Sequence, residues 1–141
     1  MSEFEQCLKR RGLVRFESAS DVVAREIASA NEDLDDAALL LEHGRWKRLT
    51  ITAYYAMFHA ARALVFQAGY AEKSHYCLAV AFRELFADET EGRELAMGLE
   101  RARSLRENAD YLAEHDEAAA RAALAVARRF VRFAEQRLRV G

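Results

Sequence analysis

The chain has 141 residues, of which 52% are hydrophobic and 31% charged, and its formal net charge is −2 at pH 7. A chain of this length corresponds to one ordinary domain, in which about 68–70% of the surface of the unfolded chain is buried on folding. The near balance of charge excludes a general attraction of the whole molecule to nucleic acid or anionic membranes, so anion binding requires a local patch.

The composition indicates an all-α fold, because the sequence has no proline and only six glycines to interrupt helices. No apolar run approaches the length of about 20 residues that spans a bilayer, and the N-terminus lacks the pattern of a signal peptide. We therefore expect a cytoplasmic protein without a membrane segment. Cys7 and Cys77 lack the spacing of metal ligands, and we expect both to be reduced thiols.

Residues 1–17 are expected to form an N-terminal arm or short helix, with a turn at Gly12. An amphipathic helix is predicted to follow, beginning at Ser18 or Ser20 as its N-cap and ending near His43. Its inward positions recur every three or four residues, at Val23, Ile27, Ala30, Leu34, Ala37 and Leu41.

A second long helix is predicted from about Arg45 to Gln67, between Gly44 and Gly69. It is apolar on nearly all sides, and a helix without a polar face has to be central in the fold. Its few polar side chains need partners, because an unpaired buried donor or acceptor costs about 1–3 kcal/mol. These side chains therefore specify the fold, carry function, or do both.

Three further helices are predicted: one capped by Ser74, a fourth carrying Leu95 to Leu112, and a last one from about Asp116 to Arg139. Short connections favour antiparallel neighbours. The predicted architecture is an antiparallel up-and-down bundle of four main helices plus a short additional helix, forming a single helical domain over residues 1–141.

The fourth helix carries the densest polar cluster of the chain. One interpretation is ordinary helical ion pairing, Arg103 with Glu107 and Arg106 with Asp110, and the other is a binding or catalytic cleft. On the last helix, four arginines fall within a strip about 40° wide, which is either a solvated face or a contact for phosphates or an acidic partner. The stripe consists of Arg121, Arg128, Arg132 and Arg139.

His59 and His75 are the histidines expected to lie inside, either as hydrogen-bonded core residues or as parts of a site. No pair of histidines has the spacing of a helical zinc site, and the chain contains a single Glu-x-x-His sequence, Glu72 to His75, where a di-iron bundle needs two. We therefore predict neither a metal nor another cofactor.

Three segments together resemble a known family. Residues 54–64 read YYAMFHAARAL, Lys73-Ser74-His75 precedes Phe82, and residues 106–111 read RENADY. The combination resembles the HEPN superfamily, the higher-eukaryote-and-prokaryote nucleotide-binding domains, and within it the small stand-alone bacterial and archaeal branch. The resemblance implies a dimerising helical bundle, often encoded beside a minimal nucleotidyltransferase with which it forms a toxin–antitoxin pair.

Several members of this superfamily are metal-independent ribonucleases that use an arginine followed after four to six residues by a histidine. In this chain the residue that follows Arg106 after four others is Tyr111, and His115 lies outside the window. The resemblance therefore favours a dimeric binding module for a nucleotide, RNA or a nucleotidyltransferase partner. The candidate binding residues are Arg103, Arg106, Asn108, Asp110 and Tyr111, with His59, His75 and Arg62 as secondary candidates.

Two alternatives stay open. The first is a metal-independent ribonuclease toxin, with Arg106 and Tyr111 as catalytic candidates, or with His59, His75 or His115 brought to Arg106 in space. The second is a purely structural scaffold for another chain.

Overall fold

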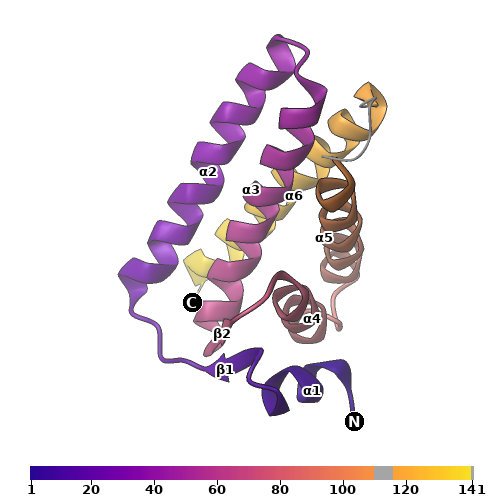
Figure 1. Cartoon of the computed structure of the whole chain (residues 1–141). Helices are drawn as coiled ribbons and strands as arrows, with labels where there is room; N and C mark the ends of the chain where they lie inside the picture. Colours follow the sequence, from indigo (N-terminus) through magenta and orange to yellow (C-terminus); the bar gives the residue numbers. More distant parts are fainter. Residues whose placement is uncertain (110–115, 141) are drawn as a thin grey trace.

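The computed structural model describes residues 1–109 and 116–140 (Figure 1). Within them the chain is almost entirely helical, which confirms the all-α class. The elements, in chain order, are α1 (Glu3–Lys9), β1 (Leu13–Arg15), α2 (Ser20–Glu42), α3 (Trp46–Gln67), β2 (Tyr70–Glu72), α4 (His75–Leu85), α5 (Thr90–Ala109) and α6 (Glu117–Val140).

Helices α2 and α3 form a long antiparallel hairpin (Figure 1). Gly44 follows the end of α2 with a φ of 65°, a conformation that glycine adopts without strain, as the sequence predicted. The predicted serine cap of α2 is wrong, because Ala19 occupies the N-cap position without a side-chain hydrogen bond. Ser18 is drawn away from the cap because its hydroxyl donates to the carbonyl of Phe66, 2.9 Å away.

Helix α3 is the centre of the fold, as its apolar sequence predicted. It packs against α2, α4, α5 and α6, and Figure 1 shows α5 leading away from α4 and α6 returning behind α3. No helix in the described ranges is long and apolar enough to cross a membrane. The buried residues of α3 cover most of its circumference: Leu49, Thr50, Ala53, Tyr54, Ala56, Met57, Phe58, Ala60, Ala61, Ala63, Leu64, Val65 and Phe66.

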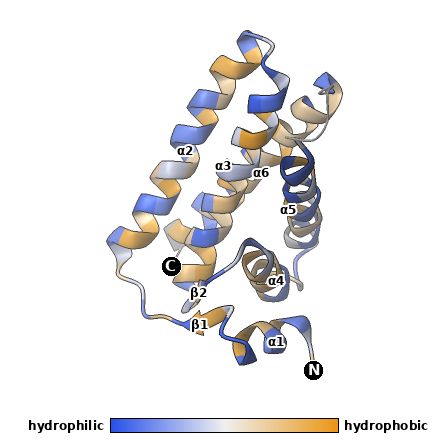
Figure 2. Cartoon of the chain, in the orientation of Figure 1, coloured by the Kyte–Doolittle hydropathy of each residue, from blue (hydrophilic) through white to orange (hydrophobic). Residues whose placement is uncertain are grey.

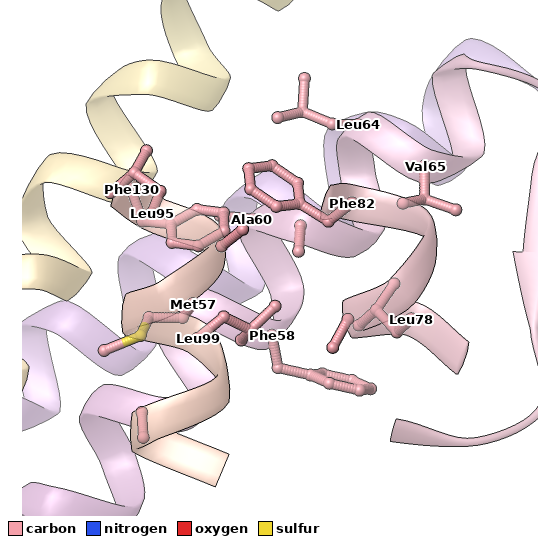
Figure 3. Close-up of a cluster of buried hydrophobic side chains, with 14 of the residues drawn as sticks. Met57, Phe58, Ala60, Leu64, Val65, Leu78, Phe82, Leu95, Leu99 and Phe130 are labelled. Carbon is pink, nitrogen blue, oxygen red and sulfur yellow. The ribbon is translucent and has the colours of Figure 1, made fainter. Parts of the chain in front are cut away.

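Side chains from α3, α4, α5 and α6 build the main core (Figure 3). Phe82 of α4 and Phe130 of α6 are fully buried, and their ring centres lie 4.7 Å apart. Figure 2 shows apolar and polar residues alternating along α2, as expected for a helix that covers one side of this core. The core holds α4 and α5 against the middle of α3, and this arrangement positions the polar residues described below.

A short antiparallel pair of strands, with Leu13 opposite Glu72 and Arg15 opposite Tyr70, joins the N-terminal segment to the bundle. This pair could not be predicted from the sequence, because strands of three residues are too short to show an alternating pattern. The predicted N-terminal helix is present as α1. Ser2 caps it by accepting a hydrogen bond from the backbone N–H of Glu5.

Cys7 and Cys77 form a disulfide, so the prediction of two reduced thiols is wrong. The residues are 70 positions apart in sequence, and their Cα atoms come within 5.9 Å because the strand pair lays α1 across α4. Polar contacts reinforce this attachment: Tyr76 and Arg83, both of α4, donate hydrogen bonds to the carboxylate of Glu3 at 2.6 and 2.9 Å. Spacing alone does not reveal such a long-range pairing.

Candidate functional site

The side chain of Arg106 lies against the central helix. It projects from α5 onto α3, where Nη1 donates a hydrogen bond to the hydroxyl of Tyr55, 3.2 Å away. The guanidinium carbon also lies 5.3 Å from the ring centre of Tyr54 and 5.7 Å from that of Tyr55, within range of cation–π attraction. The Nε atom of Arg106 is buried and is without a hydrogen-bond partner among the described residues.

His75 lies beside the same tyrosines, at the start of α4. Ser74 fixes this end of the helix, as predicted, by accepting a hydrogen bond from the backbone N–H of Cys77. The Nδ1 atom of His75 is 2.5 Å from the hydroxyl of Tyr54. Its ring stacks on Phe58, with centres 4.6 Å apart and planes 24° from parallel.

We call Tyr54, Tyr55, His75 and Arg106 the arginine–tyrosine cluster. Burial lowers the pKa of His75, and the positive charges of Arg106 and Arg103 lower it further. Burial also raises the pKa of Tyr54 far above its usual value. The cluster therefore holds a neutral imidazole and a protonated phenol beside a permanent cation at neutral pH.

The remaining candidates on α5 have different surroundings. Arg103 forms ion pairs with Glu100 at 3.0 Å and Glu107 at 3.1 Å, which confirms the predicted helical pairing of Arg103 with Glu107. The hydrogen bond to Glu100 raises the pKa of Arg103. Asn108 is exposed near the end of α5. The candidates that lie outside the described residues are Asp110, Tyr111 and His115.

His59 and Arg62 belong to a second polar group, which we call the Glu26 network. The carboxylate of Glu26 on α2 accepts hydrogen bonds from His59 Nδ1 at 2.6 Å and Arg62 Nη1 at 3.0 Å. Arg62 Nε reaches Glu72 of β2 at 2.9 Å. Asp33 lies farther away, 3.9 Å from His59 Nε2, and its pKa is raised by burial. This network ties α2, α3 and β2 together, which is sufficient to explain its residues structurally.

The arginine stripe of α6 is only partly paired. Arg121 bonds Glu117 at 2.8 Å and lies over the ring of Trp46, 5.4 Å from its centre. Arg128 and Arg132 are exposed, and within the described ranges no carboxylate pairs with either. Arg139 lies within α6. The stripe thus offers two solvated cations without making a defined pocket.

A hollow on the described surface is separate from both polar groups. Its volume is about 560 Å³, and it lies between α2 and the C-terminal ends of α3 and α6, where mostly apolar side chains line it. The arginine–tyrosine cluster does not line this hollow. Its polar and aromatic side chains lie where α3, α4 and α5 pack against one another. The described residues contain no group of three or more histidine, cysteine or acidic side chains able to hold a metal.

Tyr54 and Tyr55 are not among the candidate site residues predicted from the sequence, and neither are Glu26 and Glu72, the partners of Arg62. The tyrosines could have been recognised from the sequence, since polar groups on a mostly apolar, central helix need partners. Glu26 could also have been recognised, because it lies four residues before Ala30, on a side of α2 that faces the bundle. Nothing in the sequence indicated Glu72 as a partner of Arg62, since its position depends on the unpredicted strand pair.

The fold and cluster define an all-helical bundle in which an arginine and a histidine from two helices meet two tyrosines of a central helix. The model of the HEPN domain matches residues 23–137, and the chain belongs to this family. It is 35% identical over 95 residues to a UPF0332 protein of Archaeoglobus fulgidus, a match covering 64% of this chain and 73% of the relative. It is also 42% identical over 53 residues to a UPF0332 protein of Pyrococcus horikoshii, covering 38% of this chain and 37% of the relative.

Proposed function

We propose that the protein is a dimeric HEPN-type module that binds a nucleotide or RNA through the arginine–tyrosine cluster. The observation that carries the proposal is the placement of Arg106, which is held over two tyrosine rings with a buried Nε that lacks a partner among the described residues. A guanidinium offers donors in a planar fork that matches phosphate oxygens. A phosphate at this surface would accept from Nη2 of Arg106, which bonds no residue that the structure describes.

Aromatic groups beside the arginine suit the same class of ligand. The rings of Tyr55 and His75 are half-buried, and their centres lie 6.3 Å apart. Nucleobases stack on such rings, with each stacked base worth about 1–3 kcal/mol. The combination of a cation with aromatic faces therefore favours a nucleotide over a simple anion.

The dimer and a protein partner are further parts of the proposal, and the family resemblance supports them. In a two-fold dimer, the ends of the two α5 helices would line one shared groove, with Arg103, Arg106 and Asn108 of each subunit followed by Asp110 and Tyr111. The proposed protein partner is a minimal nucleotidyltransferase, in a toxin–antitoxin arrangement. Copurification with such an enzyme tests this part, and sedimentation of the protein alone tests the dimer.

The binding test compares two arginines of the same helix. Arg106→Ala and Arg101→Ala remove the same charge from α5, but Arg101 is exposed and lies outside the cluster. Fluorescence anisotropy with a labelled single-stranded RNA, at one fixed salt concentration, is expected to show about a tenfold or greater loss of affinity for Arg106→Ala only. Equal affinities for the two variants would contradict the proposal.

A metal-independent ribonuclease is the second candidate. One observation favours it: His75 and Arg106 both contact Tyr54, so His75 is a candidate for the histidine that is missing from the Arg106 segment in sequence. Incubation of the pure protein with unstructured RNA in EDTA would reveal this activity. Cleavage that disappears in both Arg106→Ala and His75→Ala would support a ribonuclease. Background-level cleavage by the wild-type protein would exclude it.

A further inference from the structure

The hydroxyl proton of Tyr54 requires an acceptor. Tyr54 is only 1% exposed, and a buried hydroxyl that donates to nothing is strongly disfavoured. Within the described part of the chain, the hydrogen-bond partner of this hydroxyl is Nδ1 of His75, at 2.5 Å. Tyr54 therefore donates, and Nδ1 accepts.

The direction of this bond determines where His75 carries its proton. An imidazole nitrogen that accepts a hydrogen bond is unprotonated, so the ring of His75 is neutral and its single proton is on Nε2. Burial supports this state in both partners, because it lowers the pKa of His75 and raises that of Tyr54. The imidazole is thus an Nε2–H donor at neutral pH.

Packing also fixes the direction in which this donor points. The ring of His75 stacks on Phe58 and lies nearly parallel to Tyr54, at an angle of 18°. A flip of the ring would keep the stacking but break the bond to Tyr54. Nε2 itself forms no hydrogen bond with any residue that the structure describes.

We propose that Tyr54 is a positioning residue that holds His75 as an Nε2–H donor, so that His75 and Arg106 together bind a phosphate group. Both residues then offer donors only: Nε2–H from the histidine, and the Nη2–H groups of the arginine, which bond no residue that the structure describes. A phosphate has acceptor oxygens on every side and is the complementary ligand.

This assignment rests on the proposed binding function and gives His75 a definite role within it. A general base must have a free lone pair facing the proton that it removes. In His75 the lone pair is on Nδ1 and is occupied by Tyr54. His75 therefore binds and orients a phosphate, and it does not remove a proton from a ribose hydroxyl.

Nitrogen NMR of histidine-labelled protein measures the tautomer directly, without a ligand. We expect His75 of the wild-type protein to be neutral with its proton on Nε2 at about pH 7, and Tyr54→Phe to show a mixture of the two neutral tautomers. His43→Asn, at the exposed end of α2, assigns a second histidine and leaves the signal of His75 unchanged. An Nδ1–H tautomer or an imidazolium in the wild-type protein would overturn the assignment.

The same spectra test the ligand. Inorganic phosphate, AMP and a short RNA are titrated separately, and a shift of the Nε2–H signal by any of them supports phosphate recognition, with their order showing whether a free phosphate, a nucleotide or a polymer is preferred. His75→Asn keeps an acceptor for Tyr54 but lacks the Nε2 donor, and it should bind about tenfold more weakly. If no ligand moves the signal, the phosphate assignment and the proposed binding function fail, while the tautomer result decides the role of Tyr54 separately.

Discussion

Arg106 of α5 donates a hydrogen bond from Nη1 to the hydroxyl of Tyr55 on α3, 3.2 Å away, while its guanidinium covers the same ring. A lysine at position 106 would keep the positive charge, but its single nitrogen has no planar fork that offers separate donors to Tyr55 and to a phosphate. Arg106→Lys is therefore expected to bind RNA about as weakly as Arg106→Ala, measured by anisotropy of a labelled RNA.

The exposed Arg101 provides the control, because Arg101→Lys makes the same chemical change on the same helix. This control should keep the wild-type affinity. Wild-type affinity in Arg106→Lys would show that charge alone is recognised, and the planar geometry of the cluster would then be irrelevant to binding.

Phe58 supports the cluster from within the core. Its side chain is 9% exposed, packs near Leu78 and Leu99 (Figure 3), and lies under the ring of His75. Phe58→Ala removes a buried aromatic ring and should lower the free energy of unfolding by about 3–5 kcal/mol. Urea denaturation measures this loss. Met97→Ala, at a side chain that is 73% exposed, should change stability by less than about 0.5 kcal/mol, and equal stabilities of the two variants would refute the central position of α3.

Much of the fold could be predicted because its signals are local. Gly44, Gly69 and Ser74 mark helix ends through backbone conformation and capping, and these features depend on a few neighbouring residues. The apolar character of α3 on nearly all sides was also visible in the sequence. The strand pair and the disulfide were not, because each joins residues far apart in the chain through contacts that no periodic pattern encodes.

The candidate site was predicted only in part, for the same physical reason. Arg106 is a candidate from the sequence because it lies in the polar cluster of the fourth helix. His75 is one because it is expected to be buried. Their meeting at Tyr54 depends on how α4 and α5 pack against α3. That packing is set by the combined shapes of many apolar side chains, and no single segment contains it.

The disulfide between Cys7 and Cys77 should contribute strongly to stability. It closes a loop of 70 positions, and the chain-entropy model gives such a crosslink about 4 kcal/mol. Reduction of the wild-type protein, or replacement of both cysteines by serine, should lower the unfolding midpoint in urea. Reducing agent should leave the stability of the double serine variant unchanged. Two free thiols found by alkylation of the unfolded, unreduced protein would contradict the crosslink.

Arg62 should stabilise the attachment of α2 and β2 to the central helix. Its guanidinium bonds Glu26 and Glu72, whose side chains are only 13% and 7% exposed. Arg62→Met keeps the apolar stem but leaves two poorly solvated carboxylates without their cation, which should cost about 1.5–3 kcal/mol in urea denaturation.

An exposed ion pair offers the comparison. Arg25 and Asp21 are 76% and 71% exposed, and Arg25→Met should cost less than about 1 kcal/mol. Adding Glu72→Gln to Arg62→Met removes one stranded charge and should restore part of the lost stability. A double variant as unstable as the sum of the two single changes would argue against direct coupling of Arg62 and Glu72.

His75 should make stability depend on pH in a defined window. Burial lowers its pKa in the folded protein, with Arg106 and Arg103 acting in the same direction, whereas in the unfolded chain the pKa is about 6.5. Between these two values the unfolded chain binds more protons, so the free energy of unfolding falls as the pH is lowered from about 7 through 6.5 towards the folded pKa. Above about pH 7 this contribution is fully present.

Two other shifted groups act at lower pH and can be separated from this effect. The raised pKa of Asp33 adds stability as the pH falls through its titration range, and the lowered pKa of Glu3 has the opposite sign, the ordinary values being 3.8 and 4.5. Urea denaturation at about pH 7, 6 and 5.5 should therefore show a smaller loss of stability in His75→Asn than in the wild-type protein, because the asparagine side chain does not titrate. Met97→Ala, which changes no titrating group, should follow the wild-type curve. If His75→Asn lost as much stability over this range as the wild-type protein, the titration of His75 would not be linked to folding, since its pKa would then be the same in both states.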